Sequence, residues 1–162
     1  MATRPNTTTA SSVRPLPLIY TLFFLYLEPL STLVGAYYAH FQPSEYMQMT
    51  LPSPQTLHPR EPIVLTQLAN LYLLFALNEA LVLRATDSRA VWKAFLFGML
   101  VADFGHVYSV KDVGMSVYWE VWRWNAMYWG NLGFVYVGAT LRTCFLLGVG
   151  LPKEGDRKAK GR

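Results

Sequence analysis

Four long apolar runs set the main constraint on what this chain can fold into. Each has at least 20 residues, and about 20 are enough for a helix to cross a bilayer. A soluble all-helical protein is the alternative, but four such runs are hard to bury in 162 residues. The sequence therefore predicts an all-α polytopic membrane protein, a bundle of four transmembrane helices. The runs cover residues 16–39, 63–83, 91–110 and 127–148.

Composition supports this class and leaves no room for a separate soluble catalytic domain. Only 15% of the residues are charged, whereas a soluble domain has about 25%. The net charge of +4 comes from basic residues beside the spans rather than on one face, which argues against a nucleic-acid partner. The single cysteine, Cys144, lies in the fourth run and is interpreted as a small packing residue, not a catalytic thiol.

The basic residues also predict an orientation. Ten of the 14 lysines and arginines lie on the side of the two termini, three lie on the other side, and Arg142 lies within a span. The positive-inside rule then places both termini in the cytosol, so the sequon at Asn6 would stay unglycosylated. We expect a disordered tail over 1–14, a membrane domain over 15–151 and a basic tail over 152–162.

Two lysines near the end of the sequence bear on location. Lys158 and Lys160 are the fifth and third residues from the end. This spacing resembles the dilysine retrieval signal of endoplasmic reticulum membrane proteins, although an ordinary basic flank has the same composition. We predict a multi-pass protein of the endoplasmic reticulum.

The loops differ in length and in proline content. The first, roughly 40–62, contains five prolines and is expected to be extended and to lie over the lumenal mouth of the bundle. The second, around 85–90, is a tight hairpin that predicts antiparallel, neighbouring second and third spans.

Each span carries one charged residue away from its ends, which indicates a polar pocket. A charge at bilayer depth costs roughly 2.5–3.5 kcal/mol, so such residues usually face the interior of a bundle. Glu79 and Arg142 lie about 9 Å and 7 Å to the cytosolic side of their span centres at 1.5 Å per residue. We therefore predict an ion pair between them. This pair is structural, or else Glu79 acts directly in catalysis.

The remaining acids lie deeper or nearer the lumen. Glu28 is at the middle of the first span, beside Pro29, which frees a backbone carbonyl and favours a kink. Asp103 and His106 are three residues apart and share a helix face. Asn70 and Asn131 fall in the same lumenal half. We interpret Glu28 and Asp103 as the unpaired acids.

Aromatic residues cluster at the lumenal end of the fourth span. Trp124 and Trp129 belong to a membrane-interface belt or to a wall that steadies a ligand cation. A protonated acid, a base and aromatic walls suit alkene protonation and proton abstraction. One histidine among scattered carboxylates has no zinc-ligand spacing, so we predict neither a metal nor a cofactor.

Several motifs occur in this order along the chain: Leu18-Ile19-Tyr20, Phe23-Phe24-Leu25, Glu28-Pro29, Asn78-Glu79, Asp103-Phe104-Gly105-His106, Trp124-Asn125, Trp129-Gly130-Asn131 and Arg142. In these motifs the chain resembles a family of small fungal integral-membrane proteins of unknown function, itself distantly similar to EXPERA-type four-helix membrane proteins. The resemblance covers about 15–151. In the EXPERA group, which includes the emopamil-binding sterol isomerases and the sigma-2 receptor type, a lumen-capped pocket binds sterols or cationic amphiphiles.

The resemblance implies a pocket lined by Glu28, Glu79, Asp103 and Asn131. The isomerases place their histidine with an acid on the second span, whereas His106 is on the third span beside Asp103. Ligand binding is thus implied more strongly than isomerisation. The candidate catalytic residues are Asp103, His106 and Glu28, and the candidate ligand-binding residues are Glu79, Asn78, Asn131, Trp129, Trp124 and Asn70.

Three functions remain open from the sequence. The first is a lipid or terpenoid isomerase or cyclase that uses acid–base carbocation chemistry. The second is a binding or trafficking protein for a sterol-like ligand. The third is a structural accessory subunit, in which Gly98 and Gly130 permit close approach of a helix from a second copy or a membrane partner. The expected partners are membrane lipids and an apolar lipid or terpenoid small molecule.

Overall fold

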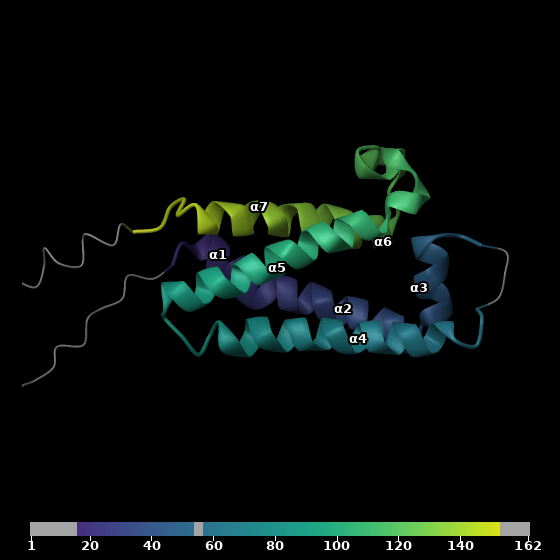
Figure 1. Cartoon of the computed structure of the whole chain (residues 1–162), viewed down its shortest axis with the longest axis horizontal. Coiled ribbons are helices and arrows are strands. Elements are labelled where there is room, and N and C mark those ends of the chain that lie inside the picture. Colours follow the sequence, from purple (N-terminus) through teal and green to yellow (C-terminus); the bar gives the residue numbers. More distant parts are fainter. Residues whose placement is uncertain (1–15, 54–56, 153–162) are drawn as a thin grey trace, which may run out of the picture.

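The chain folds into four long helices that run alternately up and down along one axis (Figure 1). The structure, a computed structural model, describes residues 16–53 and 57–152, and these contain helices and loops but no strand. Most residues of the two expected tails, with the sequon and the two terminal lysines, lie outside the described residues.

Each long helix begins and ends within two residues of an expected apolar run. Three of the four contain a five-residue π-helical segment, which in the second helix forms the C-terminal end. The first long helix consists of α1 (Leu18–Leu22), the π segment Phe23–Leu27 and α2 (Glu28–Phe41). The second consists of α4 (Glu61–Leu77) and the π segment Asn78–Val82, and the third is α5 (Arg89–Ser109). The fourth consists of α6 (Ala126–Tyr128), the π segment Trp129–Gly133 and α7 (Phe134–Leu146).

Three of these helices are long and apolar enough to cross a membrane: Leu18–Phe41, Glu61–Val82 and the third helix with its extension, Arg89–Val113. The fourth is of similar length, but Asn131 and Arg142 lower its hydropathy. The chain is thus an all-helical protein with membrane-spanning character.

The bundle is built from two helix pairs. Helix α2 packs mainly against α4, and α5 packs mainly against α7. Helices α4 and α5 are antiparallel and joined by a short loop, as expected, but neither has the other as its main neighbour (Figure 1). The reason is that residues of both helices face a cavity that lies between the two pairs.

The end of the bundle that carries the first and last described residues, here the terminal end, is closed by an apolar core. Tyr20 and Phe145 meet edge to face with ring centroids 5.2 Å apart. Gly148, with φ 82°, turns the chain after α7, and the Tyr20 hydroxyl donates a hydrogen bond to the Val149 carbonyl at 2.9 Å. The buried members of this core are Tyr20, Phe23, Phe24, Leu83, Trp92, Leu96 and Phe145.

The opposite end is covered by α3 (Pro43–Thr50), which lies across the bundle axis (Figure 1). The expectation of an extended loop over 40–62 is therefore wrong for these residues. Pro43 is at the start of α3, where a helix needs no backbone N–H donor, and Pro52 follows its end. The prolines delimit this helix rather than prevent it.

Helix α3 is held in place from two sides. The Asn125 side-chain amide donates to the Met49 carbonyl at 2.8 Å, and the Tyr128 hydroxyl donates to the Thr50 carbonyl at 2.5 Å. On the α4 side, the hydroxyls of Tyr46 and Tyr72 are 3.1 Å apart. This end of the bundle, here the α3 end, is therefore capped by a tethered helix.

Candidate functional site

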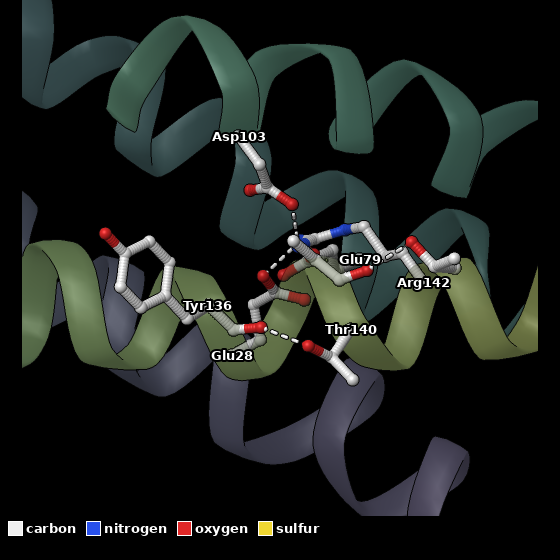
Figure 2. Close-up of polar contacts among 8 residues, drawn as sticks. Glu28, Glu79, Asp103, Tyr136, Thr140 and Arg142 are labelled. Atoms are coloured by element: carbon white, nitrogen blue, oxygen red, sulfur yellow. Dashed lines mark hydrogen bonds and ion pairs between the residues drawn. The ribbon is translucent and has the colours of Figure 1, made fainter. Parts of the chain in front are cut away.

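Three buried carboxylates, one from each of the other long helices, meet around Arg142 (Figure 2). Its side chain is fully buried, and Nη1 donates to Asp103 Oδ2 at 2.6 Å. Nη2 donates to Glu28 Oε1 and lies 3.6 Å from Glu79 Oε1. The ring of Phe24 lies 5.7 Å from the guanidinium carbon. A single arginine thus links the two helix pairs.

Side-chain direction explains why Arg142 reaches so far. Long side chains on a helix point back toward its N-terminus, so the guanidinium covers the turn before its own Cα. That turn contains Gly138, where an added Cβ would lie only 2.6 Å from Arg142 Nη1. The missing side chain at 138 therefore leaves the space that the guanidinium occupies.

The structure changes the expected grouping of these charges. Glu28 and Asp103 are not unpaired acids, because both accept hydrogen bonds from Arg142. Glu79 does lie within ion-pair distance of Arg142, but without a hydrogen bond to it. The depths in the membrane that were counted from Cα positions placed Asp103 and Arg142 in different halves of the bundle. The Arg142 side chain points back toward the N-terminus of its helix, so its guanidinium reaches the depth of Asp103.

Glu79 is the least compensated member of the cluster. It is fully buried, and neither of its carboxylate oxygens has a hydrogen-bond partner among the described residues. Its carboxyl group lies against that of Glu28, whose Oε2 also lacks a partner there. The cluster formally contains three carboxylates and one guanidinium, so negative charge is in excess.

A π segment and a proline set the position of Glu28. The Glu28 N–H bonds to the Phe23 carbonyl, the π-helical spacing, and Pro29 has no N–H to return to Leu25. Arg84 Nη2 donates to the Leu25 carbonyl at 2.7 Å in its place. The carbonyl expected to be freed by Pro29 is therefore satisfied by an arginine from the end of the second helix.

A cavity of about 490 Å³ lies between the two helix pairs, on the α3 side of Arg142. Glu28 and Asp103 form its polar end, and Met49 of α3 contributes from the opposite end. Its other walls are mostly apolar or aromatic. The lining residues include Tyr38, Leu68, Leu71, Tyr72, Phe75, Met99, Ala102, His106, Asn131, Phe134 and Val135.

The three candidate catalytic residues, Glu28, Asp103 and His106, all line this cavity, and so does Asn131. The other candidate ligand-binding residues do not. Glu79 lies behind Glu28, and Asn70 is exposed on α4 away from the lining. Asn78 precedes Glu79 in the same π segment and is also absent from the lining.

The two tryptophans pack on each other instead of facing the cavity. Their rings meet edge to face at 5.2 Å, and the Trp124 indole N–H donates to the Val117 carbonyl at 2.8 Å. Trp129 is 55% exposed. An added Cβ at Gly133 would lie 2.8 Å from the Trp129 ring, so that glycine makes room for the ring. Trp124 and Trp129 therefore do not form a wall of the cavity.

Several lining residues were missed by the sequence reasoning. Tyr38, Tyr72 and Met49 carry no charge and lie in runs where an aromatic or a methionine is ordinary. The role of Gly138 could have been predicted from the sequence. A glycine four residues before an arginine on the same helix lies under the arginine side chain and leaves room for it.

The site can neutralise or orient a polar group at one end of an apolar chamber. One oxygen of Glu28 and one of Asp103 are held by Arg142, which fixes both carboxylates. Within residues 16–53 and 57–152 no group of three or more histidines, cysteines or acids is arranged to hold a metal ion.

Comparison with known proteins gives one finding. A family model described as a domain of unknown function (DUF7704) matches residues 13–152, which is most of the chain. No curated protein and no solved structure matches. The chain belongs to the DUF7704 family of domains of unknown function.

Proposed function

We propose that this protein binds an apolar, sterol-like or terpenoid ligand inside the membrane, with an amine or hydroxyl of the ligand at Glu28 and Asp103. One observation carries the proposal: a largely apolar cavity of about 490 Å³ ends at these two carboxylates. The volume is within the range of small-molecule pockets, about 300–1,000 Å³.

The charge of the cluster supports an amine as the preferred head group. Three carboxylates face one guanidinium in a place removed from water, and uncompensated buried charge is costly. Protonation of carboxyl groups, a ligand cation, or both together offset the two excess negative charges. A hydroxyl can serve as well, since it donates one hydrogen bond to a carboxylate oxygen.

Binding of decylamine, a cation with one apolar tail, tests the proposal. Protein in lipid nanodiscs is titrated in a calorimeter, with empty nanodiscs as the blank. Leu68 lines the cavity, so Leu68→Trp should fill it and weaken binding at least tenfold. Leu74 is exposed on the same helix outside the lining, so Leu74→Trp is the matched control and should bind as wild type. Equal binding by both variants would rule out this cavity.

A second function, a lipid or terpenoid isomerase or cyclase, is favoured by a separate observation. Asp103 and His106 lie one helical turn apart and line the same cavity. Asp103 Oδ1 would give a proton to one alkene carbon, which leaves a cation at the other alkene carbon. His106 would then take a proton from the next carbon along, which moves the double bond, and return of a proton from His106 to Asp103 would complete the cycle. The resemblance to the EXPERA-type isomerases is in line with this chemistry.

Catalysis is tested by incubating the purified protein with a prenyl or sterol alkene in D₂O and following deuterium uptake into recovered substrate. Asp103→Asn and His106→Ala should each abolish uptake if the residues act as proposed. His58→Ala, an exposed histidine outside the cavity, is the control. Uptake that survives both cavity variants would leave binding as the function.

We propose further that all four long helices span the membrane of the endoplasmic reticulum and that both termini are cytosolic. The fourth helix packs within the bundle beside α5 and is as long as the others, which supports a fourth span. A glycan on Asn6 would contradict this topology. A sequon introduced into the first loop should be glycosylated.

A further inference from the structure

A second polar feature lies at the other end of the cavity, next to α3. Tyr72 of α4 lines the cavity, and its hydroxyl is 3.1 Å from the hydroxyl of Tyr46 on α3. Tyr46 is 6% exposed and is not part of the lining. The two hydroxyls therefore form a pair of which only the Tyr72 member faces the chamber.

The pair retains hydrogen-bonding capacity that the protein does not use. Each tyrosine hydroxyl has one donor and can also accept. The bond between Tyr46 and Tyr72 consumes one donor and one acceptor, and no other hydrogen bond of either hydroxyl is seen among the described residues. When Tyr46 donates, the Tyr72 O–H remains available to an oxygen atom in the cavity.

The Tyr72 ring has a fixed place on the wall. Its Cδ2 and Cε2 atoms lie 3.4 Å from the position of a Cβ on Gly35, which is ordinary van der Waals contact. One edge of the ring therefore lies close to α2 at Gly35. A hydroxyl held by a packed ring and by a second hydroxyl is preorganised for a ligand group.

The two polar ends are well separated. Gly35, on which Tyr72 packs, is seven residues beyond Glu28 on α2, a rise of about 10 Å, so the interval from carboxylates to hydroxyl is about 10–15 Å. Between them the walls are mostly apolar, and the polar side chains there include those of Ser31, Thr32, His106 and Asn131. The side chains that form this middle section include Leu68, Leu71, Phe75, Met99, Phe134 and Val135.

We propose that the Tyr72–Tyr46 hydroxyl pair is a second binding subsite, which takes a hydroxyl or carbonyl oxygen at the far end of the ligand. The ligand class is then an elongated apolar molecule with a polar atom at each end, one at Glu28 and Asp103 and one at Tyr72. This inference rests on the proposed binding function. It also gives α3 a part in recognition, because Tyr46 belongs to that helix.

A pair of probes that differ only at the far end tests the subsite. Decylamine and 10-aminodecan-1-ol have the same chain and amine, and only the second carries a distal hydroxyl. For wild-type protein in nanodiscs, 10-aminodecan-1-ol should bind about fivefold more tightly than decylamine, the effect of one additional net hydrogen bond. In Tyr72→Phe, which keeps the ring on Gly35, the two probes should bind equally.

Two further variants separate a subsite from a change in folding. Tyr46→Phe removes the partner hydroxyl and should reduce the preference without abolishing it. Tyr20→Phe removes a buried hydroxyl bonded to Val149 at the terminal end, outside the lining, and should keep the full preference. This variant controls for loss of stability.

The outcomes are distinct. Tight decylamine binding with no preference for the amino alcohol, or a preference that survives Tyr72→Phe, would overturn the second subsite and leave the proposed function intact. Failure of both probes to bind the wild type would overturn the proposed function, and the subsite with it.

Discussion

The guanidinium of Arg142 lies directly over Gly138, one helical turn earlier on α7, with Nη1 2.6 Å from the position that a Cβ would occupy. The same position is 3.5 Å from Glu28 Oε1. Gly138 thus makes room for the arginine and for the carboxylate that it binds. The polar end of the cavity depends on a residue that has no side chain.

Replacing Gly138 with alanine should displace the guanidinium from Glu28 and Asp103. Because breaking a buried ion pair costs about 3–5 kcal/mol, we expect Gly138→Ala to lower the apparent melting temperature of the detergent-solubilised protein markedly. The control is Gly98→Ala on α5, where a Cβ meets nothing within 4 Å. It should be neutral or slightly stabilising, since alanine is the better helix former by about 1 kcal/mol. A similar loss in both variants would contradict this account.

Removal of the Arg142 side chain should prevent the protein from folding rather than impair its function alone. Arg142→Ala leaves three buried carboxylates without a cation, and we expect no monodisperse protein in size-exclusion chromatography. Adding Glu28→Gln, Glu79→Gln and Asp103→Asn to the same chain should restore folding, because all three unpaired charges are then removed. Arg123→Ala, which breaks an exposed pair with Glu120, should cost at most about 1 kcal/mol.

Arg84 and Pro29 should show coupled effects on stability. Arg84→Met removes the donor to the Leu25 carbonyl and should destabilise the wild type by about 1 kcal/mol. In a Pro29→Ala background the backbone gains an N–H that can return to that carbonyl, so the same change at Arg84 should cost little. A double-mutant cycle on thermal stability measures the coupling, and additive losses would show that the two sites are independent.

Helix α3 should open more readily when its side-chain tethers are cut. Asn125→Ala and Tyr128→Phe remove the donors to the Met49 and Thr50 carbonyls. Hydrogen–deuterium exchange of peptides from Pro43–Thr50 should then become faster, while exchange in Leu18–Phe41 stays unchanged. Uniformly faster exchange would point to global destabilisation instead.

The sequence predicted the long helices well, because the length of an apolar run is set by the membrane thickness and needs no tertiary information. It did not predict α3. This helix is short and is stabilised by contacts from distant residues, Asn125, Tyr128 and Tyr72, which no local pattern contains. The number of prolines in 40–62 led to the wrong prediction of an extended loop, because proline disrupts a helix only at interior positions.

The charged residues were found from the sequence, but their partners were only partly found. Depth counted at Cα suggested Glu79 for Arg142, whereas the hydrogen bonds go to Glu28 and Asp103. The rise per residue gives the depth of a Cα atom only. The guanidinium of an arginine lies about one helical turn away from its own Cα, so its depth differs. Trp124 and Trp129 were placed at the right end of the fourth helix, but the space at Gly133 turned their rings toward each other.

The three π-helical segments have a consequence for comparing this chain with its relatives. Each accommodates one residue more than an α-helix of the same length needs, and each lies beside or around a polar residue of the site: Glu28, Glu79 or Asn131. Relatives that lack such a segment should align with a one-residue gap inside a membrane helix, at 23–27, 78–82 or 129–133. A gap at one of these positions would change which side chains of that turn face the interior of the bundle, so the presence or absence of that single residue can sort the family into members that retain this site and members that do not.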